Sequence, residues 1–241
     1  MNNFRKTLSV SSVSYCVFLI SCFSITGCSR ETEEAAVVGD VFGGGIVFYI
    51  MQPGDPGYAA GETHGLIASK QDMRYSDVSS VDPDTRDPSY SDSMRSEDNE
   101  EGFVNVFRWS TSSEDPASPH NARKPVPGTL TALGTGAVNS AAILAVYPKG
   151  AYRYTAAAIC DSYQSEGYTD WYLPSKDELN TLYENSDAVG GFAVNVDYWS
   201  DFYWSSSESS DGDAWSQNFI DGFQYSNFKD NSIRVRAVRT F

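Results

Sequence analysis

The side chains that most often carry catalysis or bind metals are scarce in this chain. It contains two histidines, His64 and His120, and four cysteines. A hydrolase triad needs Ser, His and a carboxylate together, and neither histidine lies in a recognisable catalytic signature. A zinc site would need more His and Cys ligands than the chain supplies. A pair of carboxylates can hydrolyse glycosides, but 32 acidic residues make such a pair uninformative without geometry. We therefore expect no catalytic, cofactor-binding or metal-binding residues, and no enzyme activity.

The N-terminus has the layout of a bacterial lipoprotein signal. Arg5 and Lys6 precede an apolar stretch at residues 10–25, which is too short and too interrupted to span a membrane. The stretch leads into Ile-Thr-Gly-Cys, which resembles a lipobox with Ile in place of the usual Leu. We expect residues 1–27 to be a signal peptide and Cys28 to carry the lipid, because acyl chains anchor a protein firmly. An ordinary secretory signal cut nearby, or an uncleaved anchor, is the alternative.

The other cysteines follow from this assignment. Cys16 and Cys22 would leave with the signal peptide and Cys28 would be acylated, so Cys160 has no intramolecular disulfide partner. Cys160 lies in the apolar run AAAIC, which favours a buried core thiol. A nucleophilic role is the alternative.

The charge of the chain limits the class of its partners. The formal net charge is −15, and nucleic acid is bound by a basic face, so we expect no nucleic-acid partner. The acidity predicts a soluble, self-repelling surface. The lipid on Cys28 would make the membrane a partner through the anchor alone.

The rest of the chain reads as one domain. Residues 28–37 form a short acidic tether, and residues 38–241 form the domain. A glycine turn precedes a predicted apolar strand at residues 46–50, and HGLIASKQD continues the strand pattern. Residues from about 75 to 102 are polar and acidic and predict a long surface insertion. Its spacing of Asp residues does not match an EF-hand loop.

Three helices are predicted in the second half. Two cover residues 139–146 and 154–163. The third opens at Ser175, where Ser175 and Glu178 fit a capping box. Beyond residues 190–191 the pattern predicts short strands to the end. The terminal run IRVRAVRTF predicts a strand with its arginines on one face, paired with carboxylates such as Glu178.

The last forty-odd residues carry the strongest functional pattern. Large apolar side chains, Ile220, Phe223, Tyr225 and Phe228, are scattered through a run of Ser, Asp, Gly and Asn. Isolated apolar groups in a polar run are more typical of a binding surface than of a solvated loop. We therefore predict a recognition face on loops between residues 205 and 232. Its candidate ligand-binding residues are Ser209, Ser210, Asp211, Asp213, Ser216, Ile220, Asp221, Phe223, Tyr225, Asn227, Phe228 and Asp230.

Several sequence blocks together resemble one bacterial family. GGGIVFYI, YTDWYLPSKDELNTLYEN, YWSSSE, AWSQNF and RVRAVR are similar to the domain at the C-terminus of collagen-like adhesins of the Lcl type and in many surface lipoproteins. We expect the resemblance to cover most of residues 38–241. It implies an α+β, C-type-lectin-like fold, with small twisted antiparallel sheets, a few helices and extensive loops.

Two departures limit what the resemblance implies. The related formylglycine-generating enzymes use two active-site cysteines, whereas only Cys160 would survive maturation here. Calcium-dependent lectins use Glu-Pro-Asn or Gln-Pro-Asp triplets, and the sequence contains neither. Fold alone does not carry function, so neither enzyme chemistry nor calcium-dependent sugar binding is expected.

The resemblance also suggests a source of variation. Members of this superfamily include variable proteins of diversity-generating retroelements, in which adenines are copied with errors. Such changes in an Asn codon reach Ser, Asp, Gly, Tyr, Phe and Ile, but not Lys, Glu, Gln, Met or Trp. Between positions 208 and 234 every residue is reachable except four of the family's constant frame: Trp215, Gln217, Gln224 and Lys229. An ordinary polar loop region is the alternative.

The sequence therefore predicts a lipid-anchored, extracytoplasmic ligand-binding protein of the bacterial cell envelope, at the outer membrane or cell surface. Its ligand would be a protein or glycan, bound without a cofactor. The alternatives are a non-variable adhesin, a structural envelope lipoprotein and, with less support, an enzyme related to the formylglycine generators.

Overall fold

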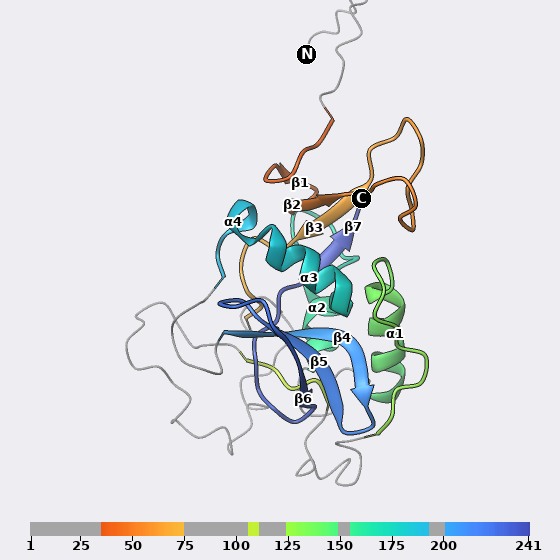
Figure 1. Ribbon diagram of the computed structural model, residues 1–241, viewed down its shortest axis with the longest axis vertical. Helices are drawn as coiled ribbons and strands as arrows, with labels where there is room; N and C mark the ends of the chain where they lie inside the picture. Colours follow the sequence, from red (N-terminus) through yellow and green to blue (C-terminus); the bar gives the residue numbers. More distant parts are fainter. Residues whose placement is uncertain (1–34, 75–105, 111–123, 149–154, 193–200) are drawn as a thin grey trace, which may run out of the picture. The chain divides into compact units, whose positions relative to one another are not determined.

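Two small antiparallel sheets and four helices make up the computed structural model (Figure 1). It describes residues 35–74, 106–110, 124–148, 155–192 and 201–241. The predicted signal peptide, the lipid-bearing Cys28, most of the tether and the polar insertion at about 75–102 lie outside the described residues. Ala35–Phe241 form one compact unit. The predicted α+β class is confirmed in these elements.

The first sheet joins the start of the domain to its end. Strand order is β1-β2-β3-β7, all antiparallel. Gly43 and Gly44 connect the first two strands, and both have positive φ, as a two-residue hairpin turn of this hand requires. The predicted glycine turn and apolar strand are therefore confirmed. The strands are β1 (Val41–Phe42), β2 (Gly45–Ile50), β3 (Gly65–Ala68) and β7 (Val238–Thr240).

The second sheet is a three-stranded meander in the C-terminal segment. Strand order is β4-β5-β6, so β6 is an edge strand. The register between β5 and β6 is continuous, whereas β4 is irregular between Trp204 and Ser210. The strands are β4 (Phe202–Ser210), β5 (Asp213–Asn218) and β6 (Gln224–Phe228). The region that the sequence predicts as recognition loops is therefore mostly strand.

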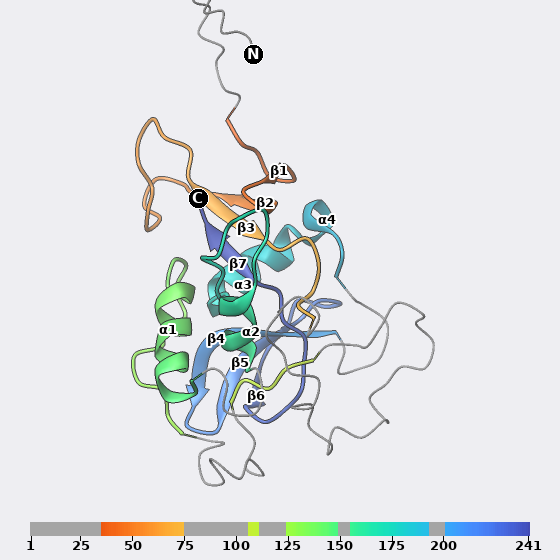
Figure 2. The ribbon, with the colours of Figure 1, turned by 180° about the vertical axis from the view of Figure 1, so that it is seen from behind.

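The helices are α1 (Gly136–Val146), α2 (Ala156–Ser162), α3 (Lys176–Glu184) and α4 (Ser186–Val189). The capping box of α3 is confirmed: Ser175 Oγ accepts from Glu178 N at 3.2 Å, and Glu178 Oε2 accepts from Ser175 N at 2.8 Å. The one-turn α4 is not predicted from the sequence. Helix α3 lies on the near side in Figure 1 and α2 on the near side in Figure 2.

Buried apolar side chains gather in two clusters, and β4 contributes to both. Trp204 packs in one cluster with residues of α2, and Tyr203 packs in the other with Leu179 and Leu182 of α3. Trp204 is fully buried and donates its indole N–H to Phe107 O at 2.8 Å, so it belongs to the core that supports the sheet. Cys160 is fully buried, and burial raises the pKa of its thiol well above the usual value. The prediction that Cys160 is a buried core thiol is therefore confirmed.

The arginines of the terminal run do not pair with Glu178, contrary to the prediction. Arg236 and Arg234 both reach Asp72, at 2.9 and 3.5 Å, and Arg239 pairs with Asp170 at 2.7 Å. Glu178 instead accepts the backbone N–H groups of Ser175, at the start of α3, and of Gly134, before α1, at 2.8 and 2.9 Å. The segment runs between the two sheets, so its valines and its arginines are both buried. None of the helices in the described ranges is long and apolar enough to cross a membrane.

Candidate functional site

A buried ion pair fixes the turn between β4 and β5. The side chain of Lys229 is fully buried, and its Nζ contacts the carboxylate of Glu208 and donates to the carbonyl oxygens of Asp211 and Lys124, at 2.9 and 3.0 Å. Burial lowers the pKa of Lys229, and the hydrogen bond to Glu208 opposes this shift. Glu208 also accepts the N–H of Val126 at 2.9 Å. Because a buried ammonium needs all of these partners, the turn is held in one geometry.

Two glutamines attach the other end of the sheet to α3. Gln217 Nε2 donates to Asn180 Oδ1 at 2.9 Å and to Gly222 O at 3.0 Å. Gln224 Nε2 donates to Lys176 O at 3.0 Å. Three of the four residues that the resemblance assigns to the family's frame hold the sheet through their polar groups: Gln217, Gln224 and Lys229.

The turn between β5 and β6 is held by side chains that accept from the backbone. Asn218 Oδ1 accepts from Ile220 N at 2.7 Å, and Asp221 Oδ1 accepts from Phe223 N at 3.0 Å. Gly222 has φ +77°, and a Cβ there would lie 2.4 Å from the Tyr183 ring. These contacts direct Ile220 and Phe223 into solvent, where they are 50% and 65% exposed.

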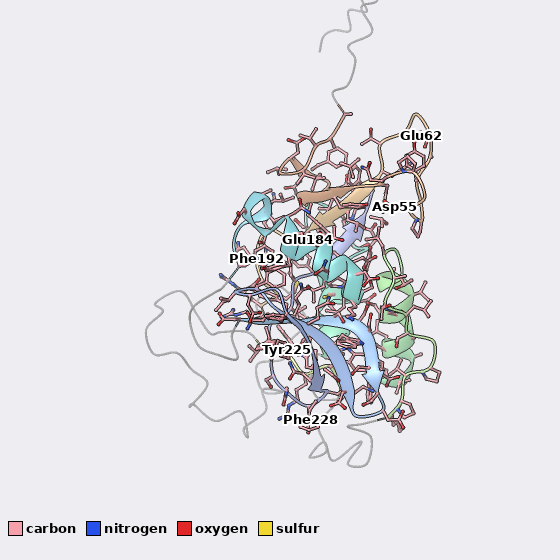
Figure 3. The ribbon with its side chains drawn as sticks, in the orientation of Figure 1. Asp55, Glu62, Glu184, Phe192, Tyr225 and Phe228 are labelled. Carbon is pink, nitrogen blue, oxygen red and sulfur yellow. The ribbon has the colours of Figure 1, made fainter. Side chains whose placement is uncertain are left out.

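The four apolar residues that the sequence singles out are all exposed, but the structure divides them. Phe223 and Tyr225 adjoin at the hairpin tip, with ring centroids 6.4 Å apart, and Tyr225 also packs on Phe202 at 5.4 Å. Phe228 lies three residues further along β6, about 10 Å away, near the turn between β4 and β5 (Figure 3). Since side chains alternate along a strand, Phe228 also projects from the face opposite to that of Tyr225.

The polar candidates follow the same division. Asp221 lies at the hairpin tip, whereas Ser210 donates to Asp213 Oδ2 at 2.6 Å near the other turn. Ser209 shares a hydrogen bond of 2.6 Å with Ser226. The exposed candidates are Ser210, Asp211, Ile220, Asp221, Phe223, Tyr225 and Phe228. Half-buried are Ser209, Asp213, Asn227 and Asp230.

Ser216 is not available to a ligand, which corrects the prediction for this residue. It is 1% exposed, and its Oγ accepts from Asn227 Nδ2 at 2.7 Å. Ser216 lies on the central strand β5 opposite Trp204, so its side chain faces the core. The serines at 205–207 of β4 are also buried, and their hydroxyls donate to the carbonyl oxygens of Trp215, Pro174 and Leu130.

Three residues outside the predicted ligand-binding set adjoin this surface, and one of them, Trp215, is assigned by the sequence to the constant frame. Ser226 is exposed in the middle of β6, and Trp215 is half-buried on the adjacent strand. Lys176 of α3 places its ammonium 3.7 Å from the centre of the Trp215 ring. Trp215 pairs with Ser226 across the strands, and this alternation is the signal that could have assigned it to the outer face. We define the recognition surface as the four exposed apolar residues Ile220, Phe223, Tyr225 and Phe228.

The charge on this part of the chain is almost wholly negative. Between positions 205 and 233 the only cation is Lys229, which is buried, while Asp211 and Asp213 flank one end of β6 and Asp221 the other. Within the described ranges, no group of three or more His, Cys, Asp or Glu side chains is placed to hold a metal ion.

The sequence that contains this sheet matches the model of a known protein family. The model of the Lcl C-terminal domain matches residues 107–239, which begin after the GGGIVFYI block. The matched region contains all four helices and the entire β4–β5–β6 sheet, whereas β1 to β3 lie outside it. A search of curated proteins finds no match. Since the family model covers more than half of the 241 residues, the chain belongs to the Lcl C-terminal domain family.

Proposed function

We propose that this protein is a lipid-anchored, extracytoplasmic binding protein whose C-type-lectin-like domain recognises a ligand through the recognition surface. Family membership favours a cell-surface protein. The small antiparallel sheets, few helices and long connections agree with a C-type-lectin-like fold. The anchor would be the lipid on Cys28, and the site would be the bacterial outer membrane or cell surface. No catalytic step is part of this proposal.

One observation carries the proposal. Ile220, Phe223, Tyr225 and Phe228 are each between 40% and 65% exposed, on a sheet that the buried, hydrogen-bonded side chains of Lys229 and Gln217 hold in place. Covering exposed aromatic rings favours association. Because the sheet is already ordered, less conformational entropy is lost on binding. Aromatic side chains have few rotatable bonds and also lose little conformational entropy. Antibody loops combine aromatic anchors with adaptable polar groups in a similar way.

Binding is tested with the purified full chain on glycan arrays and on suspensions of bacterial and eukaryotic cells. We expect single Ser substitutions at Ile220, Phe223 and Tyr225 to weaken binding by about tenfold or more. Leu130→Ser and Val138→Ser are matched controls, because both residues are exposed apolar side chains, at 58% and 66%, outside the sheet. Equal losses in both sets, or no loss in the first, would reject this surface.

We further propose that a diversity-generating retroelement varies the recognition surface. The structure separates the positions reachable from Asn codons into exposed or half-buried ones and five that are buried: Ala214, Ser216, Asn218, Phe219 and Ile233. If the region is a retroelement target, the surrounding DNA holds a near-repeat of the segment coding for residues 203–241, rich in AAC and AAT codons, beside a reverse transcriptase gene. We expect variants among relatives to change the exposed positions and to keep the five buried ones. Absence of the repeat would leave a fixed-ligand adhesin or a structural lipoprotein.

The lipid anchor is tested separately. Expressed in a Gram-negative host with a radiolabelled fatty acid, the chain is expected to incorporate label and to sediment with membranes. Cys28→Ser should abolish the label, whereas Cys160→Ser should retain it. Label in the Cys28→Ser variant would contradict lipidation at this residue.

A further inference from the structure

The outer edge of β6 is open in the part of the chain that the structure describes. β6 pairs with β5 on one side, and no described strand pairs with its other side. Tyr225, Ser226 and Phe228 are all exposed along it. An edge strand presents unpaired N–H and C=O groups that can template another chain.

The hydrogen-bond phase of the hairpin shows which groups face outward. Asn218 N donates to Phe223 O, and Lys229 N donates to Gly212 O, each at 3.0 Å. Both pairs follow the register of β5 with β6. Because hydrogen-bonded and non-bonded pairs alternate in an antiparallel ladder, the backbone groups of Tyr225 and Asn227 face β5. Those of Gln224 and Ser226 therefore point away from the sheet.

Within the described residues, β6 lacks three of the features by which proteins block such pairing. Natural edges carry Lys or Pro, or a bulge that twists the strand away. β6 reads QYSNF, with neither residue, and its register with β5 contains no bulge. The exposed strand is thus straight enough, and uncharged enough, to accept a neighbour.

The flanking side chains indicate the chemistry of that neighbour. Phe223 and Tyr225 lie on one face of the sheet, and Trp215 and Phe228 lie on the other. Apolar side chains of an added strand would therefore have apolar contacts on both faces. Asp221 at one end and Asp211 and Asp213 at the other attract positive charge. An extended peptide with an apolar centre and basic ends matches this pattern of backbone, apolar and acidic groups.

We propose that β6 binds an extended polypeptide as a fourth strand of the sheet, with Ser226 as the central backbone contact. The bound segment would carry apolar residues in its middle and Lys or Arg at its ends. This is the β-augmentation mode of recognition, in which backbone bonds give affinity and flanking side chains give specificity. The inference rests on the proposed recognition surface and names its class of partner.

The probe is a phage-displayed library of random peptides of about twelve residues, a length that covers a strand and its flanks, selected on the detergent-purified full chain. We expect enriched peptides with alternating apolar residues and basic ends. The amide hydrogens of Ser226 and Gln224 should exchange more slowly with solvent in the complex than in the free protein.

Two substitutions at Ser226 distinguish the contribution of its backbone N–H to peptide binding from that of its side chain. Ser226→Pro removes an outward N–H and leaves the β5 ladder intact, and proline is tolerated on edge strands. It should weaken peptide binding by about tenfold or more, as expected for a central backbone bond. Ser226→Ala loses the hydrogen bond to Ser209 but keeps the N–H, and should bind within about threefold of the wild type. Unchanged thermal unfolding of both variants shows that the fold persists.

The outcomes distinguish this inference from the proposed function. If Ser226→Pro binds normally while Phe223→Ser and Tyr225→Ser do not, strand addition is wrong and the recognition surface stands. If none of the three changes binding, both proposals fail. Failure of the selection to enrich any basic, apolar peptide, or equal losses for Pro and Ala at Ser226, would likewise overturn strand addition.

Discussion

At the scale of single residues, the buried side chain of Lys229 holds three segments of the chain together through hydrogen bonds. It joins the end of β6 to the turn between β4 and β5 and to the chain near Lys124, and it lies 4.7 Å from the centre of the Trp109 ring. A buried ion pair is weak support for stability when it is compared with a well-packed apolar pair, but removing one partner leaves an uncompensated charge.

Lys229→Met should therefore destabilise the fold by about 3–5 kcal/mol, because Glu208 loses its cation. The double variant Glu208→Gln/Lys229→Met should recover part of this loss. Urea unfolding measures both, and Lys124→Met, at an exposed side chain, should stay within about 0.5 kcal/mol of the wild type. A double variant no more stable than the single one would show that the charge on Glu208 is not the cause.

Cys160 provides a second test at this scale, and it addresses the enzyme alternative. Its thiol is fully buried and its pKa is raised by burial, and thiolates are the reactive form. We expect iodoacetamide at neutral pH to spare Cys160 in the folded chain and to modify it after unfolding in urea, as peptide mass spectrometry will show. Rapid modification of the native protein would instead mark an accessible, reactive cysteine.

At the scale of elements, the local geometry of the β5–β6 hairpin determines how the side chains of the proposed recognition surface are presented. Its tip depends on one glycine in the left-handed region, packed against Tyr183 of α3. The same helix holds the hairpin base through Asn180 and Lys176. The orientation of Phe223 is thus coupled to α3.

Gly222→Ala should destabilise the protein more than Gly128→Ala, which is the matched control. Both glycines have positive φ, at +77° and +89°, but a Cβ at Gly128 meets nothing within 4 Å. The control should lose about 1–2 kcal/mol from backbone strain alone, and Gly222→Ala should add the clash with Tyr183. Thermal unfolding compares the two, and Gly222→Ala should also weaken ligand binding. Equal destabilisation would mean that the Tyr183 contact does not constrain the tip.

At the scale of the whole molecule, the C-terminal strand closes the domain. β7 pairs with β3, and Arg239 donates to both carboxylate oxygens of Asp170, at 2.7 and 2.9 Å. Those hydrogen bonds hold the pKa of Asp170 below its usual 3.8, although burial opposes them. Burial is the larger effect at Glu178 and raises its pKa from 4.5, although backbone hydrogen bonds oppose this shift.

These two shifts predict opposite pH dependences of stability. The contribution of Asp170 is present above pH 3.8 and is lost as pH falls through its lowered folded-state pKa. The folded state binds the Glu178 proton more tightly than the unfolded state does. The stability of the fold therefore falls as pH rises from about 4.5, the unfolded value, through the raised folded-state pKa. Asp170→Asn should flatten the acid loss of stability, and Glu178→Gln should remove the opposing slope. Urea midpoints measured from pH 2.5 to 7 test both, and unchanged slopes would show that neither carboxyl titrates as inferred.

The local elements could be predicted from the sequence because their causes lie within a few residues. The capping box at Ser175, the glycine turn before β2 and the apolar strand after it depend on side chains and backbone conformations close along the chain. The burial of Cys160 followed from its apolar neighbours. The exposed character of Ile220, Phe223, Tyr225 and Phe228 was also foreseeable, because apolar groups isolated in a polar run lack apolar neighbours along the strand.

Only the tertiary structure decided how those residues are arranged. Ser216 is buried because β5 is the central strand, and Phe228 projects opposite Tyr225 because β6 is a strand rather than a loop. Arg236 pairs with Asp72, 164 positions away, and no local pattern specifies a partner at that distance. Sequence neighbours determine which elements form, whereas strand order and packing determine which of their faces meet solvent, and the recognition surface depends on both.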